Sequence, residues 1–175
     1  MNIFLEIFLW TTYLCALYFA VFWLLSFLDR KELFKKEEEK STELKNYPEV
    51  SVIIPAYNAE RTIQKCIQSV IELDYPREKL ELIVINDGSE DSTEEKIKEL
   101  IMENKDLGMS LKLISQENKG KAAALNNALK TAKGELFACL DSDSFVERAT
   151  LKKMVYVFMT NGDDLKIVIP ALKVS

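Results

Sequence analysis

Two aspartates one residue apart, Asp141 and Asp143, are the side chains around which the rest of this sequence is arranged. They follow the apolar run 136–140, which predicts a fully buried strand. Two carboxylates at a strand end repel each other and lose solvation unless a cation lies between them. Hard divalent ions prefer oxygen ligands, and one or two carboxylates often hold them together with a substrate's phosphates. The pair therefore indicates either such a cation site or a polar turn that caps the next helix.

The composition restricts the chemistry further. The chain has 175 residues, a net charge of -5, no histidine and three cysteines. Without histidine there is no imidazole base, no His-based triad and no zinc site of the usual His type. The negative charge argues against a nucleic-acid partner, which would need a basic patch. Cys15, Cys66 and Cys139 are widely spaced in apolar patterns, so we predict that they are small buried hydrophobic residues.

The N-terminal segment, residues 1–28, contains a charge-free apolar run from Ile7 to Leu28 that is long enough to span a bilayer as a helix. A cleaved signal peptide would need a basic start and a shorter run, and a buried core helix would not be apolar all round. We therefore predict a single-pass anchor in contact with membrane lipid. Lysine and arginine follow the span and are absent before it, which predicts a cytoplasmic location for the rest of the chain.

Residues 29–49 are rich in lysine and glutamate and poor in apolar side chains. We interpret them as a charged cytoplasmic linker, helical in part through its Glu–Lys spacing. Pro48 closes the linker, and residues 50–175 are the predicted folded domain.

Strand and helix patterns alternate through residues 50–175. The expected helices include one capped by Asn58 and one that begins with a Ser92–Glu95 capping box. Short apolar strands between helices predict an α/β fold with a mostly parallel sheet and helices on both faces. The expected strands are 50–54, 82–85, 111–114, 136–140 and a fifth that begins at 167–169.

Four polar clusters follow these strands: 55–58, 86–89, 116–121 and 141–143. In parallel α/β sheets the carboxyl ends of the strands share one edge, and ligands bind there. Loops without a common role would be divided between both edges. The sequence therefore predicts one binding site made by all four clusters.

The same clusters carry a family resemblance. The segments 52–59, 83–93, 118–126 and 140–143 resemble family 2 glycosyltransferases in order and spacing, over roughly residues 50–175. The resemblance implies a GT-A fold, which is Rossmann-like, and an inverting transfer of sugar from a nucleotide-sugar donor. The N-terminal span and the turn 74–76 look most like the membrane-bound polysaccharide synthases of that family.

The resemblance also implies roles in donor binding. Tyr57 would pack on the nucleotide base, with Pro55 and Ala56 holding the strand end beside it. Asp87 would accept a hydrogen bond from the imide N–H of the base, which favours uracil and hence UDP. The alternatives are an ordinary exposed turn tyrosine and an aspartate that forms an Asx turn at a helix entry.

The remaining roles concern the phosphates. Lys121 would meet the nucleotide or phosphate region of the donor, and a solvated lysine at a helix start is the alternative. Asp141 would lie near the ribose or the metal, and Asp143 would bind the Mg²⁺ or Mn²⁺ that bridges the diphosphate. Ser142 between them belongs to the same donor site. Glu60 is a further donor-site candidate, although a carboxylate there also suits a helix N-terminus.

The acceptor side is not assigned to this sequence. In the family the carboxylate base lies beyond the equivalent of residue 175, and Asp163 and Asp164 do not match it. The chain is then a fragment, a truncated product, or one part of an assembly in which a second chain supplies the acceptor half. We predict a glycan acceptor, with a polyprenyl phosphate lipid as the second choice. The alternative function is a non-catalytic, membrane-tethered module that binds nucleotide sugars.

Overall fold

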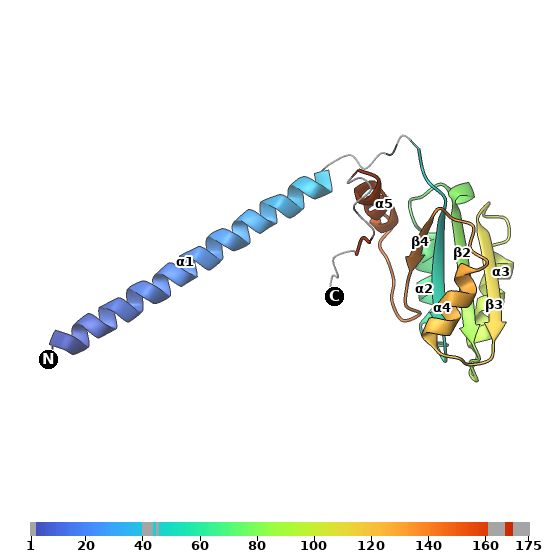
Figure 1. Cartoon of the computed structure of the whole chain (residues 1–175), viewed down its shortest axis with the longest axis horizontal. Coiled ribbons are helices and arrows are strands. Elements are labelled where there is room, and N and C mark those ends of the chain that lie inside the picture. The colour runs from blue at the N-terminus through green and yellow to red at the C-terminus, as the bar shows by residue number, and fades with distance from the viewer. Residues whose placement is uncertain (1–2, 40–43, 45, 161–166, 170–175) are drawn as a thin grey trace. The chain divides into compact units, whose positions relative to one another are not determined.

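The computed structural model of the chain describes residues 3–39, 44, 46–160 and 167–169. Their contacts divide the chain into two compact units, Met1–Ser41 and Thr42–Ser175. The first unit is a helix and the second contains the sheet (Figure 1).

The first unit is the single helix α1, Ile3–Glu39. Its part Ile3–Phe27 has 25 residues with a mean hydropathy of 1.8, so its length and composition allow it to cross a membrane. No residue of that apolar stretch is buried, which does not fit the core helix of a soluble domain. The helix continues to Glu39, so the first part of the predicted linker is helical.

The second unit is built on four strands: β1 (Val50–Ala56), β2 (Leu80–Asp87), β3 (Ser110–Gln116) and β4 (Leu136–Cys139). They form one sheet in the order β3-β2-β1-β4, and every pair is parallel. The helices are α2 (Ile63–Ile71), α3 (Thr93–Glu103), α4 (Lys121–Leu129) and α5 (Thr150–Thr160), with a 3₁₀ turn, η1 (Arg77–Lys79), before β2. The predicted α/β architecture is confirmed.

The strand register brings the carboxyl ends together. Ala56 at the end of β1 pairs with Asn86, and Asp87 at the end of β2 pairs with Gln116 at the end of β3. On the other side of β1, Ile53 pairs with Cys139, the last residue of β4. The segments that follow all four strands therefore leave the same edge of the sheet.

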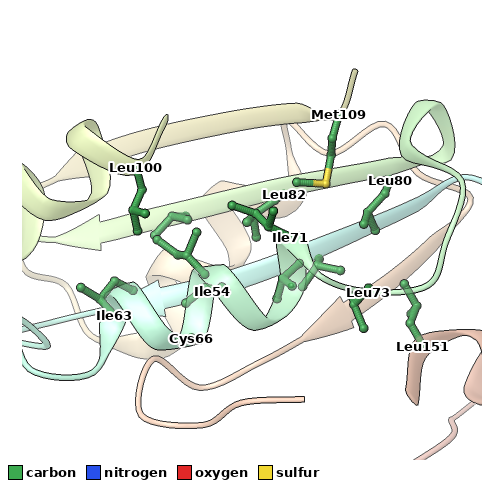
Figure 2. Packing of buried hydrophobic residues seen from close by; sticks show 14 of the residues in the cluster. Ile54, Ile63, Cys66, Ile71, Leu73, Leu80, Leu82, Leu100, Met109 and Leu151 are labelled. Carbon is green, nitrogen blue, oxygen red and sulfur yellow. The ribbon is translucent and has the colours of Figure 1, made fainter. Parts of the chain in front are cut away.

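Side chains alternate between the two faces of the sheet, and each face has its own core. Residues such as Ile54 and Leu82 pack with Ile63, Cys66 and Leu100 from α2 and α3, in the cluster that Figure 2 shows. The opposite face packs Ile53, Ile83 and Ile85 against Ala124 and Ala128 of α4. Each large side chain buried completely in these cores stabilises the fold by about 1.5–3 kcal/mol. Helices cover both faces, as predicted.

The run 136–140 is not the fully buried strand that its apolar sequence predicts. Residues of β4 alternate between half-buried and exposed, and Phe137 is 55% exposed. β4 pairs only with β1 in the described sheet, so one of its edges has no partner there. Cys139, and Cys15 on α1, are exposed as well, so of the three cysteines predicted to be buried only Cys66 is, and all three are free thiols.

The predicted capping hydrogen bonds are not formed, although Ser92 does occupy the N-cap position of α3. Asn58 does not cap α2, because a turn at residues 59–62 intervenes and the helix begins after Thr62. Ser92 precedes α3 but makes no capping hydrogen bond with its side chain. The carboxylate of Asp91 accepts from the backbone N–H of Thr93 instead, at 3.1 Å.

The predicted fifth strand is not found in the described residues. Residues 167–169 have no strand assignment, and Ile167 and Ile169 are exposed. The turn that contains Asp163 and Asp164 lies outside the described residues.

A buried carboxylate joins three strands and a turn at the amino-end edge of the sheet. Glu81 on β2 accepts from the hydroxyl of Ser51 at 2.6 Å, from the ammonium of Lys112 at 2.5 Å and from the backbone N–H of Lys133 at 2.9 Å. The N–H of Gly134 donates to the Ser51 hydroxyl, and a Cβ on that glycine would lie 2.5 Å from the Ser51 nitrogen. These contacts fix the turn before β4.

The folded unit begins before β1. Leu44 and Tyr47 pack against the larger core, and the ring of Tyr47 lies edge-on to Tyr75 with the ring centroids 5.2 Å apart. The hydroxyl of Tyr75 donates to the carbonyl of Pro48 at 2.8 Å. The end of the predicted linker is therefore held to the domain.

Candidate functional site

The four polar segments meet in a pocket of about 380 Å³ at the carboxyl ends of the strands. Every site residue predicted from the sequence lines it, with the exception of Glu60. Three further residues, Asn58, Ala59 and Thr62, line the pocket without having been predicted as site residues. The complete lining is Pro55, Ala56, Tyr57, Asn58, Ala59, Thr62, Asp87, Lys121, Asp141, Ser142 and Asp143.

The turn after β1 places Tyr57 at the pocket. Asn58 adopts a positive φ of 47°, a conformation that asparagine accepts more readily than most residues. Its N–H donates to the hydroxyl of Ser89 at 3.0 Å, and its side-chain oxygen accepts from the N–H of Glu90 at 2.9 Å. These bonds join the turn after β1 to the turn after β2. Tyr57, 49% exposed, is left with its ring available to a ligand.

Glu60 lies outside the pocket lining. Its carboxylate accepts from the N–H of Ser92 at 3.3 Å, and its carbonyl accepts from the ammonium of Lys96 at 2.7 Å. Its own N–H donates to Asp91 at 3.1 Å. Burial would raise the pKa of Asp91, but hydrogen bonds from Thr93 and Glu60 outweigh it and lower that pKa. Glu60 therefore joins the segment that follows β1 to the start of α3.

Asp87 is a buried carboxylate that holds the turn after β3. It accepts from the side-chain amide of Gln116 at 2.7 Å and from the backbone N–H groups of Lys119 and Gly120 at 3.0 and 2.8 Å. Burial acts to raise its pKa, and these three donors outweigh burial, so the pKa lies below its usual value. Asp87 does not form the Asx turn that was the alternative; the neighbouring Asn86 bonds the local backbone instead, and its side-chain oxygen accepts from the N–H of Ser89, three residues on, at 3.1 Å.

Asp87 uses three of its acceptor positions, two on Oδ1 and one on Oδ2. An ionised carboxylate has about four such positions. Within the part of the chain that the structure describes, one position on Oδ2 thus has no donor, and Asp87 lines the pocket.

A close backbone approach brings Lys121 to the site. Gly88 has a φ of 71°, and a Cβ there would lie 2.7 Å from the nitrogen of Asn118, so only glycine lets the two turns meet. The chain then turns at Gly120 and starts α4 with Lys121. The Lys121 ammonium lies 2.5 Å from Oδ1 of Asp141, with both side chains more than half exposed. The hydrogen bond to Asp141 raises the pKa of Lys121.

Asp141 and Asp143 are exposed carboxylates on the pocket wall. Within the residues that the structure describes, no group of three or more His, Cys, Asp or Glu side chains could hold a metal. Two carboxylates are nevertheless enough for Mg²⁺ or Mn²⁺ when phosphates and water complete the oxygen shell. The residues thus fit a cation that binds together with a phosphate ligand.

The buried thiol of Cys66 contacts the backbone of the segment that carries the two aspartates. It donates to the carbonyl of Asp141, with 3.4 Å between sulfur and oxygen. Burial raises the pKa of Cys66 to about 12, and the charges of Asp143 and Asp141 contribute to the rise. The thiol therefore keeps its proton at neutral pH and remains a donor.

Comparison with known proteins identifies the family of this chain. Residues 51–172 match the model of glycosyl transferase family 2. The chain therefore belongs to glycosyl transferase family 2.

The relatives include a poly-beta-1,6-N-acetyl-D-glucosamine synthase of Staphylococcus aureus, 37% identical over 119 residues, which are 68% of this chain and 27% of the synthase. Among solved structures, the mannosyltransferase PcManGT of Pyrobaculum calidifontis, in complex with GDP-Man and Mn²⁺, is 34% identical with a TM-score of 0.61; the match covers 70% of this chain and 36% of that one. S. aureus TarS 1-349 in complex with UDP-GlcNAc is 30% identical with a TM-score of 0.56, over 65% of this chain and 31% of TarS.

The fold of this chain is accordingly that of the GT-A glycosyltransferases, as predicted. The chain spans about a third of the length of the curated relatives it matches.

Proposed function

We propose that this chain forms the donor-binding part of a membrane-anchored glycosyltransferase that takes a UDP-sugar together with Mg²⁺ or Mn²⁺. The observation that carries this proposal is the pocket itself. It combines an exposed aromatic ring, a buried carboxylate with one free acceptor position, a lysine and two exposed carboxylates. These are the groups that a base, a diphosphate and its cation require.

The nucleoside end of the donor lies against the turn after β1. The exposed ring of Tyr57 stacks on the base, since every base offers a π-face. The remaining position on Oδ2 of Asp87 accepts the imide N–H of uracil. Because the pKa of Asp87 is lowered, this group is an ionised acceptor at neutral pH.

The diphosphate end lies between Lys121 and the two aspartates. When bound, the divalent ion neutralises the charge that develops on the leaving nucleoside diphosphate. Asp143 and Asp141 hold that ion through their carboxylate oxygens. Lys121, now paired with Asp141, is within reach of a phosphate oxygen at the same place. We assign the role of catalytic base to none of the described residues.

Calorimetric titration of the full chain in mild detergent tests this function. UDP is titrated with Mn²⁺ and again with EDTA, and GDP serves as the comparison nucleotide because a solved relative carries GDP-Man. We expect UDP to bind in Mn²⁺ and to lose most of its affinity in EDTA, with GDP binding more weakly. A folded chain that binds neither nucleotide would contradict the proposal.

For the acceptor we propose a growing glycan, with a polyprenyl phosphate lipid as the alternative. The resemblance to a poly-beta-1,6-N-acetyl-D-glucosamine synthase supports a polysaccharide product. Inversion at the sugar carbon is implied by the family. Transfer from labelled UDP-sugars to either acceptor class, measured with membranes that contain the whole protein, would distinguish the two acceptors.

We propose further that α1 anchors the chain in the cell membrane with the sheet domain in the cytoplasm. The apolar part Ile3–Phe27 and the basic residues that follow it support this orientation. Removal of residues 1–30 should move the protein from the membrane to the soluble fraction after ultracentrifugation. Persistent association with membranes would contradict a single anchor.

A further inference from the structure

On the basis of the donor-binding function above, we propose that Ser69 and Cys66 of α2 are positioning residues for the carboxylates of Asp141 and Asp143. Neither side chain lines the pocket. Both act on the backbone of the turn that carries the carboxylates, which we define as the aspartate turn, residues 141–146.

Helix α2 holds the first residue of the aspartate turn. The carbonyl of Asp141 accepts from the thiol of Cys66 at 3.4 Å and from the N–H of Ser144 at 2.9 Å. The thiol is 1% exposed, so no water competes with it from the solvent side. A thiol is a weak donor, so the bond orients the Asp141 carbonyl more than it stabilises the turn.

The same helix holds the last residue of the aspartate turn. The N–H of Val146 donates to the hydroxyl of Ser69 at 3.2 Å. That hydroxyl in turn donates to the carbonyl of Cys66 at 2.7 Å, three residues earlier on α2. The second bond fixes the hydroxyl hydrogen, so a lone pair of Ser69 is directed at Val146.

A third contact lies between these two. The ammonium of Lys65 lies 4.1 Å from the centroid of the Phe145 ring, which is 56% exposed. The cation–π attraction adds about 0.5–1 kcal/mol at such an exposed position. Thus one face of α2, through residues 65, 66 and 69, contacts the aspartate turn at its first residue and at its last two residues.

This attachment has a consequence for binding. The two carboxylates are exposed and have no helix or strand of their own, because β4 ends at Cys139 and α5 begins at Thr150. Their separation and direction therefore depend on the backbone of the aspartate turn. Since α2 is fixed in the core by Ile63, Ile67 and Val70, it provides the rigid support that an ion site requires.

The test compares Ser69→Ala with Ser69→Thr in the full chain. Alanine removes the acceptor for Val146 and is a better helix former, so α2 itself is not weakened. Threonine keeps the hydroxyl. The control is Gln68→Ala, which changes an exposed neighbour on α2 whose side-chain amide donates to the carboxylate of Glu72 at 2.8 Å.

Two readouts are measured for each variant. Hydrogen exchange of peptides that cover residues 141–149 reports on the turn without any ligand. Calorimetry with uridine, and with UDP plus Mn²⁺, separates the base from the diphosphate and its cation.

We expect Ser69→Ala to speed exchange in the aspartate turn and to weaken UDP binding in Mn²⁺ by about tenfold, because loss of a group that orients metal ligands typically costs about ten- to a hundredfold in metal affinity. Uridine affinity should stay within about twofold, since Tyr57 and Asp87 are untouched. Ser69→Thr should restore both readouts, and Gln68→Ala should change neither.

Unchanged exchange in Ser69→Ala would overturn the inference, and so would an equal loss of affinity for uridine, which would indicate general loosening. If the unsubstituted chain fails to bind UDP with Mn²⁺, the donor-binding function is contradicted. Exchange would still decide whether Ser69 holds the turn, so the two failures are distinguishable.

Discussion

The carboxylates at the amino ends of the strands and those at the carboxyl ends lie in opposite environments. At the amino-end edge, Glu81 is buried and accepts from Ser51, Lys112 and the backbone of Lys133. At the carboxyl-end edge, Asp141 and Asp143 are exposed, and the ion pair of Asp141 with Lys121 is itself exposed to solvent.

This difference in burial indicates separate roles: Glu81 contributes to the stability of the fold, and the exposed aspartates are available for binding. The partners of Glu81 satisfy it within the protein, and their removal would leave buried groups unpaired. Asp141 gains little from its pair with Lys121, because exposed ion pairs contribute about 0–1 kcal/mol. A carboxylate that the fold does not satisfy is available to a ligand. Asp87 combines both situations, since it holds a turn and retains one acceptor position.

The largest effect is expected on the free energy of unfolding, from a substitution at the amino ends of the strands. Glu81→Ala should lower the free energy of unfolding by about 3 kcal/mol, because it leaves the Lys112 ammonium and two further donors without their acceptor. Proteolysis of the unfolded fraction across a urea series measures the change. Glu49→Ala is the matched control, since it breaks an exposed pair with Lys79 and should cost at most about 0.5 kcal/mol. UDP affinity of the folded Glu81 variant should be unchanged, and a parallel loss of affinity would refute the separation.

The second largest effect is expected on UDP binding, from a substitution at the carboxyl ends of the strands. Asp143→Asn should weaken Mn²⁺-dependent UDP binding by about a hundredfold, because one of two carboxylate ligands is lost. The free energy of unfolding should change by less than about 0.5 kcal/mol, as for other exposed positions. Asp74→Asn, an exposed aspartate outside the pocket lining, is the control in the same titration. Unchanged UDP affinity would rule out Asp143 as a ligand.

The third effect concerns Asp87 and is read against pH. Its pKa is lowered in the fold, so its ionised form stabilises the domain above the ordinary value of 3.8, and this stabilisation is lost as the pH falls through the lowered folded pKa. Asp87→Asn should cost about 1–2 kcal/mol at pH 7, and the gap to the unsubstituted chain should close below about pH 4. Urea series from pH 7 to pH 3 measure it. A gap that stays constant with pH would show that the charge is not what stabilises the turn.

The smallest effect sharpens the contrast. Lys121→Met removes an ammonium that now occupies Asp141, so Mn²⁺ without nucleotide should bind a few-fold more tightly, roughly as expected for one exposed charge. UDP in Mn²⁺ should bind more weakly, because a phosphate contact is lost. Calorimetry with Mn²⁺ alone and then with UDP separates the two. Lys119→Met is the control, since that side chain is exposed and outside the pocket lining; weaker binding of Mn²⁺ alone by Lys121→Met would contradict this prediction.

Much of the fold follows from local patterns in the sequence. The runs at β1 and β2 are apolar on both faces, and parallel strands in a covered sheet must be so. Once the strands are parallel, the polar segments that follow them must share an edge, which is why the pocket residues could be named from their positions.

The errors arise where a distant segment decides the outcome. The apolar run at β4 does not reveal that β4 has a partner on one side only in the described sheet. Asn58 and Ser92 have capping chemistry, but Ser89 and Glu90 bond Asn58, and Asp91 takes the place of Ser92. The contact between Ser69 and Val146 joins positions with no shared pattern, so only the structure shows it.

The central place of β1 in the sheet has a consequence for synthesis. Of the four described strands β1 is made first, yet its edge facing β4 stays unpaired until residues 136–139 emerge. At about 5–20 residues per second that wait lasts roughly 4–16 seconds. During this time, the unpaired backbone edge of β1 is open to chaperones and to other nascent chains. Codon choice between residues 57 and 135 therefore sets how long this edge stays open, and the aspartate turn emerges directly after the strand that closes it.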